Sequence, residues 1–325
     1  MIDIADIEAA AARLESVSVR TPLFCSDALD MVAGGTVLVK PECLQVTGSF
    51  KIRGAYNFLS QLPPGQARRG VVAWSSGNHA QGVAAAGGLL GVATAIVMPE
   101  DAPRSKLLNT QKLGGEVITY DRYTEDREAI ARRIASERGA EVVPSYDHPH
   151  IIAGQGTVGL EIAEQSLDMG KPVQQVLICC GGGGLSAGSA IALQARLPGV
   201  AVHPVEPQDF DDTARSLERG ERLRVDAGAR SICDALQAHT PGHMTFEINR
   251  RILGRGLSVS DEEVRDAMRF AFRHFKLVVE PGGAVALAAV LSGKIPTAGK
   301  TTAIVLSGGN VDADLFAGIQ AGASG

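Results

Sequence analysis

Short runs of β-branched and other apolar residues alternate with longer segments of helical pattern along most of the chain. The strands are expected at residues 36–40, 71–75, 93–98, 116–120, 176–180, 200–206 and 302–307. Several of these runs are apolar at almost every position, which is typical of parallel strands covered on both faces. The helices are expected at residues 49–60, 78–90, 104–113, 123–138, 153–169, 185–197, 261–275 and 283–291. This alternation predicts a doubly wound α/β fold.

Two candidate boundaries, residues 61–70 and 143–150, interrupt this alternation. The first segment is polar and rich in proline and glycine, which is typical of a linker between domains. We therefore expect a small α/β domain of residues 66–145, inserted into a larger domain made of residues 1–65 and 146–325. Ligands of such folds bind at the carboxyl ends of the strands, often between domains.

Composition narrows the possible partners. The chain of 325 residues is 45% hydrophobic and carries a formal net charge of −5 without a long run of lysine and arginine. We therefore expect neither nucleic acid nor an anionic membrane as a partner. Residues 82–98 are uncharged, but this segment is shorter than a membrane span of about 20 residues and contains several glycines. It fits a buried helix, a turn and a buried strand better.

The expected compartment is the cytoplasm. Residues 1–15 are acidic and amphipathic, and they lack the basic and apolar blocks of a signal peptide. The cysteines at positions 25, 43, 179, 180 and 233 show no metal-binding spacing. Such scattered cysteines are consistent with a reducing environment.

Three of the expected strands end in small polar or glycine-rich turns. They are "SSGN" at 75–78, "GGGG" at 181–184 and "SGGN" at 307–310. Glycine lets the backbone approach a ligand closely, and the free N–H groups of a following helix bind an anion. Four consecutive glycines lose much conformational entropy on folding, and we expect that packing alone does not require all four. Two such helix starts suit two anions, for example a phosphate and a carboxylate.

The glycine run also supports a second hypothesis. Gly182, Gly184 and Ala187 match the pattern G-x-G-x-x-A between a strand and a helix, and Glu206 ends the next strand. This is the dinucleotide fingerprint in its usual context. An enzyme that uses NAD is therefore the alternative on spacing alone.

Lys51 occupies an unusual place in the segment "GSFKIRGAYN", residues 48–57. Gly48 and Ser49 indicate a helix start, so Lys51 lies in the first turn, where the helix dipole is positive and disfavours a further cation. The aromatic ring of Phe50 is adjacent in sequence. We infer that this amine readily loses its proton.

Six motifs occur in a characteristic order: "GSFKIRGAYN", "SSGNHAQGVA", "IAGQGTVGLEI", "CGGGGLSAG", "VEP" followed by "DD", and "SGGN". Together they resemble the fold-type-II pyridoxal-phosphate enzymes, in the branch of threonine/serine dehydratases, serine racemases and 3-hydroxyaspartate dehydratases. The resemblance covers nearly the whole chain. It implies a two-domain fold similar to the tryptophan synthase β subunit, with parallel or mixed sheets covered by helices. It also implies pyridoxal 5′-phosphate between the domains and a homodimer.

The resemblance implies roles for individual residues as well. Lys51 would form the Schiff base with the cofactor aldehyde. Cofactor contacts are implied for Phe50 with the ring, Asn78 with the ring oxygen, Gly181, Gly182, Gly183 and Gly184 with the phosphate, and Ser307 with the pyridine nitrogen. Contacts with the substrate carboxylate are implied for Ser75, Ser76, Gly77 and His79.

A serine at position 307 has a chemical consequence. Its hydroxyl supplies no counter-charge for a pyridinium, so the ring nitrogen should stay largely neutral. The carbanion at Cα is then short-lived, which suits loss of a leaving group from Cβ better than transamination. We expect a dehydratase that converts a β-hydroxy α-amino acid of the threonine or serine type into a 2-oxo acid and ammonia, with Lys51 as the base at Cα.

Two positions bear on the choice of substrate. The resemblance links Ser76 to racemases and hydroxyaspartate dehydratases, in which a hydroxyl on the far face of the cofactor transfers a proton; a plain loop serine is the alternative. Arg127 matches an arginine that meets the second carboxylate of dicarboxylate ligands, and a solvated helix face is the alternative. 3-Hydroxyaspartate dehydratase and serine racemase activities therefore stay open.

The acidic segment "VEPQDFDD", residues 205–212, ends a strand. In the racemase-like branch this segment is a divalent-cation site, which implies Glu206, the Phe210 carbonyl and Asp212 as ligands. Such hard oxygen ligands suit Mg²⁺, or Ca²⁺ or Mn²⁺. Acids placed at a helix N-terminus are the alternative.

Overall fold

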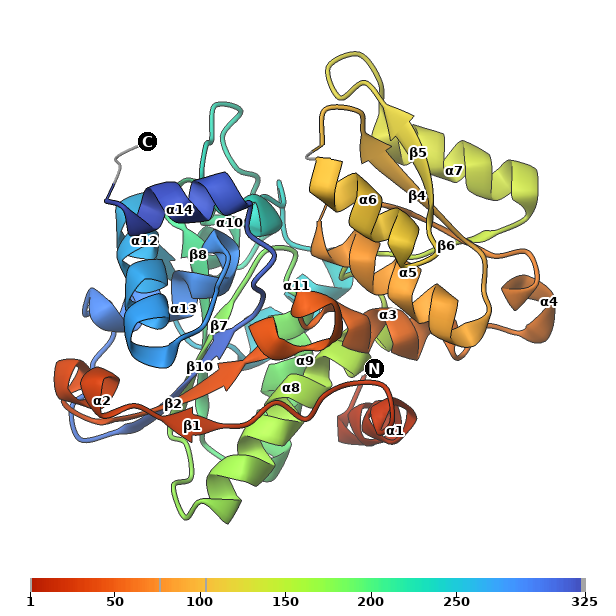
Figure 1. Ribbon diagram of the computed structural model, residues 1–325. Coiled ribbons are helices and arrows are strands. Elements are labelled where there is room, and N and C mark those ends of the chain that lie inside the picture. The colour runs from red at the N-terminus through yellow and green to blue at the C-terminus, as the bar shows by residue number, and fades with distance from the viewer. Residues whose placement is uncertain (1, 76, 103, 323–325) are drawn as a thin grey trace.

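The computed structural model describes residues 2–75, 77–102 and 104–322, and these residues form two β-sheets (Figure 1). The larger sheet has the strand order β1–β2–β10–β7–β8–β9. Its strands are β1 (Phe24–Cys25), β2 (Thr36–Pro41), β7 (Gln175–Cys179), β8 (Ala201–Pro207), β9 (Leu257–Val259) and β10 (Thr301–Leu306). Strand β1 runs antiparallel to β2, and the other neighbours run parallel. The carboxyl ends of the parallel strands therefore share one edge.

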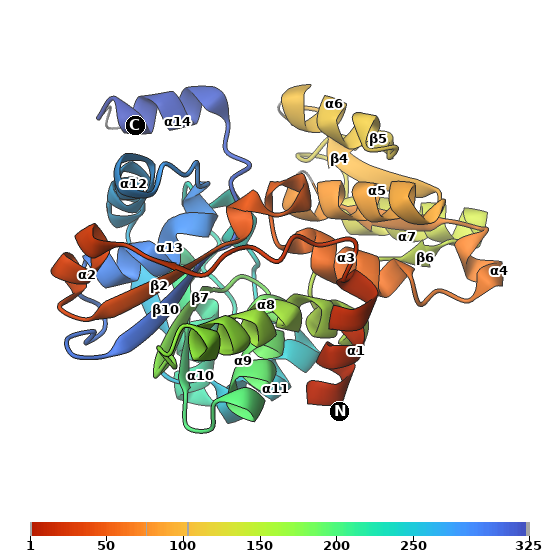
Figure 2. The same ribbon diagram turned by 60° about the horizontal axis from the view of Figure 1, so that its bottom comes forward.

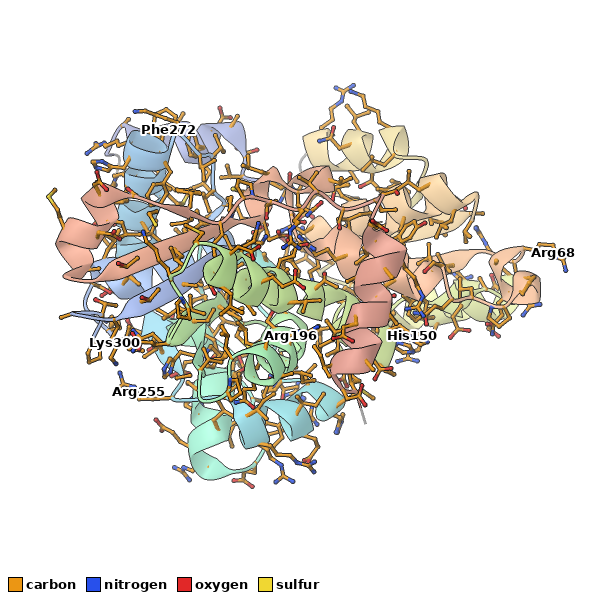
Figure 3. The ribbon with its side chains drawn as sticks, turned by 90° about the horizontal axis from the view of Figure 1, so that it is seen from below. Arg68, His150, Arg196, Arg255, Phe272 and Lys300 are labelled. Atoms are coloured by element: carbon orange, nitrogen blue, oxygen red, sulfur yellow. The ribbon has the colours of Figure 1, made fainter. Side chains whose placement is uncertain are left out.

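The smaller sheet has the order β5–β4–β3–β6, with all neighbours parallel. Its strands are β3 (Val71–Trp74), β4 (Thr94–Pro99), β5 (Glu116–Tyr120) and β6 (Glu141–Val142). The two sheets belong to two lobes (Figure 1). Figure 3 shows Arg68 at the outer end of the lobe with the smaller sheet, and Arg255 and Lys300 at the outer side of the other lobe.

Helices cover both sheets. The α-helices are α1 (Ile4–Leu14), α2 (Asp27–Ala33), α3 (Lys51–Leu59), α4 (Pro64–Ala67), α5 (Asn78–Leu90), α6 (Arg104–Lys112), α7 (Arg127–Arg138), α8 (Pro149–Asp168), α9 (Gly184–Arg196), α10 (Asp212–Arg219), α11 (His243–Ile252), α12 (Asp261–Phe270), α13 (Pro281–Leu291) and α14 (Ala313–Gln320). Short 3₁₀ turns are η1 (Glu42–Leu44), η2 (Val46–Gly48), η3 (Gln208–Phe210) and η4 (Asp234–Leu236), and a π-helical turn, η5 (Ala271–Phe275), follows α12. Figure 2 shows α12 and α13 on one side of the larger sheet and α8 and α9 on the other. Within the described part of the chain, no helix is both long and apolar enough to cross a membrane.

The predicted α/β fold is confirmed, and each predicted strand lies within one residue of an observed one at both ends. The short strands β1, β6 and β9 were not predicted, because two or three residues carry no recognisable periodicity. The helix expected at 123–138 begins at Arg127, since the side chain of Asp126 accepts the N–H groups of Glu128 and Ala129 and caps the helix there. The helix expected at 153–169 begins earlier, at Pro149, which suits the first helical position.

Alternating side chains of β3 face two different cores. Val71 and Ala73 pack with Ile52 and Phe58 of α3 on one face of the smaller sheet. Val72 belongs to the core on the other face, under α7. Helix α3 also contacts α5 and α8. It therefore lies at the junction of the two lobes, and its first residue is Lys51.

Candidate active site

Lys51 is the first residue of α3 and so lies in its first turn, as predicted, although the helix was expected to begin at residue 49. Its Nζ donates a hydrogen bond to the Ser145 carbonyl over 3.2 Å and lies 5.2 Å from the centroid of the Phe50 ring. Burial lowers the pKa of this amine to about 8. Glu280 and Cys179 act in the opposite direction, so burial outweighs both. The inferred readiness of Lys51 to lose a proton is thus supported, although burial is the main cause.

The end of β10 lies directly beside this lysine. Ser49 and Gly308 form an isolated antiparallel bridge, and the Phe50 N–H donates to the Ser307 carbonyl over 3.2 Å. Ser307 is 4% exposed, and it acts to lower the pKa of the Cys179 thiol at the end of β7, which burial raises to about 11. The segments "GSFK" and "SGGN" therefore meet at the carboxyl edge of the larger sheet.

The turn "SSGN" brings the start of α5 to the same place. The Ser75 hydroxyl accepts the Gly77 N–H over 3.2 Å, Gly77 is the N-cap of α5, and Asn78 is its first residue. Ser76, for which proton transfer and carboxylate binding were expected, lies outside the described residues. His79 is buried, and its Nε2 lies 3.1 Å from the Val143 carbonyl.

The His79 ring is neutral at ordinary pH. Burial, and secondarily the charge of Lys51, lowers the pKa of this imidazole to about 3. A neutral ring whose Nε2 faces a carbonyl oxygen must carry its proton on Nε2, which donates to that carbonyl. The ring is therefore engaged with the Val143 backbone rather than turned toward a ligand.

The glycine run connects β7 to α9, and Gly183 is the N-cap of that helix with a φ of 90°. Two side chains of α11 hold the carbonyls of the glycine run in place. Thr245 Oγ1 donates to the Gly182 oxygen over 2.7 Å, and Asn249 Nδ2 donates to the Gly183 oxygen over 3.3 Å. The free N–H groups at the start of α9 form a site for an anion such as a phosphate.

Packing accounts for part of this run. A Cβ on Gly182 would lie 2.3 Å from a ring carbon of Tyr146, and a Cβ on Gly183 would lie 2.7 Å from Asn249 Nδ2. Gly181 has only ordinary contacts at that position. Packing therefore requires the two central glycines but not all four, as expected.

The acidic segment places two buried carboxyls close together. Glu206, at 0% exposure, accepts the N–H groups of Thr213 and Ala214 over 3.0 and 2.8 Å. Asp212 is 1% exposed, and its Oδ2 is buried without a hydrogen-bond partner. Burial raises the pKa of both carboxyls, that of Asp212 to about 7, and Asp212 raises that of Glu206 further.

This geometry bears on the divalent-cation site expected for the segment and on the NAD hypothesis, which also uses Glu206. The described residues contain no group of three or more His, Cys, Asp or Glu side chains arranged for a metal. The expected set needs only two such side chains, with the carbonyl of Phe210, the last residue of η3, as the third ligand. The NAD hypothesis needs Glu206 to face a ribose, but this carboxylate is fully buried and engaged with the start of α10.

Arg127 begins α7 and is exposed, and no described residue pairs with its guanidinium. The neighbouring Glu128 contributes slightly to the raised pKa of Tyr146, after burial and the charges of Asp147 and Asp212. The geometry does not place Arg127 in direct contact with the other candidate residues.

Sequence reasoning missed two residues of this site. The carboxyl of Glu280 accepts a hydrogen bond from Asn78 over 2.6 Å, and Asn310 donates to Asn78 over 2.7 Å. Burial raises the pKa of Glu280 to about 7, and Asp234 acts in the same direction. Asn310 ends the motif "SGGN", and Glu280 precedes the proline that opens α13. The place of Asn310 in this motif and that of Glu280 before a helix start were the only sequence features that pointed to these two residues.

Comparisons with known proteins agree with this arrangement. A sequence model of the family described as "Pyridoxal-phosphate dependent enzyme" matches residues 15–308. The L-threo-3-hydroxyaspartate ammonia-lyase of Pseudomonas sp is 43% identical over 98% of this chain and 98% of its own length. The serine racemase of Schizosaccharomyces pombe is 39% identical over 96% of this chain and 95% of its own. The solved structure of a threonine deaminase from T.th. has a TM-score of 0.89 and 43% identity, covering 95% of this chain and 99% of that one.

Proposed function

We propose, since the chain belongs to the family of pyridoxal-phosphate dependent enzymes, that it removes water from a β-hydroxy α-amino acid of the threonine or serine type and releases a 2-oxo acid and ammonia. The chain is a pyridoxal-phosphate-dependent lyase, because it is similar over nearly its full length to an ammonia-lyase and a threonine deaminase. The observation that carries the proposal is the meeting of Lys51, Asn78 and Ser307 at one edge of the larger sheet.

The residues present fit pyridoxal phosphate. Asn78 has an N–H that no described residue accepts, the start of α9 offers N–H groups to a phosphate, and Ser307 offers a hydroxyl without a charge. Phe50, 9% exposed, lies beside the amine as an apolar surface for a ring. When bound, the cofactor would draw electrons from Cα of the substrate and make its proton acidic.

Lys51 would take the proton from Cα. With a pKa of about 8, its amine is a base closer to neutral pH than an ordinary lysine, whose pKa is 10.5. The backbone of the segment "SSGN" would hold the substrate carboxylate at the start of α5. Ser75, Ser76, Gly77 and His79 remain our proposed residues for this contact, with the ring of His79 contributing structure rather than charge.

A release assay tests the activity. The holoenzyme should form 2-oxo acid from threonine or serine, and borohydride should fix the cofactor on Lys51 in a mass spectrum. Lys51→Ala should abolish turnover, whereas the exposed Lys112→Ala should retain it. Absence of 2-oxo acid with every β-hydroxy amino acid tested would refute the proposed reaction while leaving the cofactor attachment intact.

3-Hydroxyaspartate is the second candidate substrate, and the exposed, unpaired guanidinium of Arg127 favours it. If this group binds the second carboxylate, 3-hydroxyaspartate should exceed threonine in kcat/KM. Arg127→Ala should then lose roughly 10- to 150-fold on hydroxyaspartate, the value of a charge-assisted hydrogen bond, and much less on threonine. Arg133→Ala on the same helix is the control. Equal losses on both substrates would assign Arg127 a structural role.

We also propose a divalent cation at Glu206, the Phe210 carbonyl and Asp212. The partnerless Asp212 oxygen beside a second buried carboxylate supports it, because hard oxygen ligands of this kind suit Mg²⁺. The cation would add positive charge to a pair in which Arg215 lowers the pKa of Asp212 without outweighing burial.

The remaining proposals concern organisation. The smaller sheet, formed within residues 71–142, supports an inserted domain of residues 66–145. Five free cysteines support a reducing, cytoplasmic location. A homodimer follows from the resemblance alone, and sedimentation of the purified protein tests it.

A further inference from the structure

Asn310, the last residue of "SGGN", makes two hydrogen bonds with one nitrogen. Its Nδ2 donates to the Thr47 carbonyl over 2.8 Å and to Asn78 Oδ1 over 2.7 Å. Thr47 lies four residues before Lys51 in the chain, and Asn78 begins α5. One side chain from the end of β10 therefore joins the segment that leads to the lysine with the helix that carries Asn78.

These contacts determine which way both amides face. A backbone carbonyl can only accept, so the atom of Asn310 that meets Thr47 must be the nitrogen. The second N–H on that nitrogen then requires an acceptor on Asn78, which must be Oδ1. The Asn78 Nδ2 is thereby turned toward Glu280, whose Oε1 lies 2.6 Å away.

The Glu280 carboxyl completes the arrangement from the other side. Asn78 is 7% exposed and Glu280 is 3% exposed, so water competes little for these bonds. A carboxyl offers an acceptor oxygen in either protonation state. One of the two N–H groups of Asn78 is used by Glu280, and the other has no acceptor among the described residues.

The backbone beside Glu280 and Asn310 has glycines at positions where any larger residue would clash with these two side chains. A Cβ on Gly308 would lie 2.2 Å from Glu280 Oε1, and a Cβ on Gly48 would lie 2.6 Å from Asn310 Oδ1. Thr47 has a φ of 65°, a left-handed conformation that is costly for a β-branched residue. The hydrogen bond from Asn310 to the Thr47 carbonyl helps to hold this strained turn.

We propose that Asn310 and Glu280 are positioning residues that hold the Asn78 amide in one of its two orientations, so that its remaining N–H serves as the donor to the ring oxygen of pyridoxal phosphate. In the opposite orientation the amide oxygen would face that electron-rich ring oxygen and repel it. The inference takes the cofactor from the proposed function and is independent of the substrate.

Cofactor titration of the apoenzyme tests the role of Asn310. Asn310→Asp keeps the shape but replaces the donor nitrogen with an acceptor, so Asn78 should turn. We expect about tenfold weaker binding of pyridoxal phosphate, which corresponds to about 1.4 kcal/mol, and a shifted absorbance maximum of the bound cofactor. Gln174→Glu, the same change at the other end of β10, is the control and should change neither.

A double-mutant cycle separates positioning from general support of the fold. If Asn310 acts through Asn78, then Asn310→Asp should weaken cofactor binding in the wild-type background but not in Asn78→Ala. The same fold-loss in both backgrounds would overturn the proposal, as would an unchanged affinity and absorbance maximum in Asn310→Asp.

Glu280 supplies a test that does not depend on folding of the Asn310 variant. Glu280→Gln retains an acceptor for Asn78 and should keep the wild-type cofactor affinity, whereas Glu280→Leu removes it and should weaken binding about as much as Asn310→Asp. Equal losses in the two Glu280 variants would show that the carboxyl acts through its charge, and would overturn its positioning role.

Discussion

Two pairs of buried carboxylates differ in what surrounds them. Glu42 and Glu161 both form ion pairs with Arg53 of α3, and Glu161 also pairs with Lys40. Glu206 lies near the end of β8 and Asp212 begins α10, and among the described residues no lysine or arginine donates a hydrogen bond to either carboxyl, although the charge of Arg215 lowers the pKa of Asp212. Both pairs are withdrawn from water, so the difference lies in the neighbouring charge.

The first group, Lys40, Glu42, Arg53 and Glu161, is termed here the balanced cluster. Arg53 donates to both oxygens of Glu42 over 2.8 and 2.9 Å and to Glu161 over 2.7 Å, and Lys40 donates to Glu161 over 2.5 Å. Burial alone would raise the pKa of Glu42, but Arg53 brings it below its ordinary value. Two cations and two anions satisfy one another.

The stability of a buried charge depends on whether a counter-charge lies beside it. A buried ion is stable only when a counter-charge and hydrogen bonds replace its lost hydration. The balanced cluster has its own counter-charges, so it can fix β2, η1, α3 and α8 together. In the Glu206–Asp212 pair the charge of Arg215 lowers the pKa of Asp212 but does not outweigh burial, so this pair favours the uptake of protons or of the proposed cation.

The largest expected effect comes from breaking the balanced cluster. Arg53→Met leaves two carboxylates facing Lys40 alone, and removing one partner of a buried pair costs about 3–5 kcal/mol. We expect a loss of this size in the free energy of unfolding of the apoenzyme, measured by urea denaturation. Adding Glu42→Gln to Arg53→Met should recover part of it, because Lys40 and Glu161 then balance.

Arg20→Met is the matched control for this loss. Arg20 pairs with Glu164 over 2.9 Å at the surface, where the two side chains are 51% and 38% exposed. Such a pair is worth only about 0–1 kcal/mol. If Arg53→Met destabilises no more than Arg20→Met, burial does not set the value of these ion pairs.

The second effect is stabilisation by a cation at the Glu206–Asp212 pair. Mg²⁺ at a hundredfold excess over its Kd should stabilise the wild-type protein by about 2.7 kcal/mol. Asp212→Asn should abolish this response, and it should not destabilise the metal-free protein, because it removes a buried like charge. Thermal denaturation with Mg²⁺ and after chelation measures both.

Two further variants sharpen this result. Asp209→Asn, an exposed acid in the same segment, and Glu42→Gln in the balanced cluster should both keep the full response to Mg²⁺. A wild-type melting temperature that is the same with Mg²⁺ and after thorough chelation would argue against an exchangeable cation.

Most of the fold follows from local pattern. Strands such as β4 and β7 are covered on both faces, so continuous apolar runs revealed them. The start of α5 at Asn78 and the place of Lys51 in the first turn of α3 were also predictable, because glycine, serine and asparagine mark helix starts. The two- or three-residue strands contain no such pattern and were found only in the structure.

Residues of the site were predictable from the sequence only where they belong to a recognisable motif. Arg53 lies in an otherwise ordinary helix and reads as a solvent-facing charge, and nothing local indicates that Glu42 and Glu161 surround it. Glu280 and Asn310 reach Asn78 through the pairing of Ser49 with Gly308, two residues that are distant in sequence. Tertiary contacts of this kind leave no periodicity in the chain.

The smallest effect tests the balanced cluster through pH. The folded pKa of Glu42 lies below its ordinary value of 4.5, so in acid the unfolded chain binds more protons than the folded one. Its contribution is therefore present above that ordinary value and is lost as pH falls through the folded pKa. One group changes stability by at most about 1.4 kcal/mol per pH unit. Glu42→Gln should flatten the acid slope measured by urea denaturation, whereas Glu164→Gln in the surface pair should flatten it less. If the two variants flatten the slope equally, the balanced cluster and the surface pair respond to acid in the same way. Burial would then not explain the contribution of Glu42 to the acid dependence of stability.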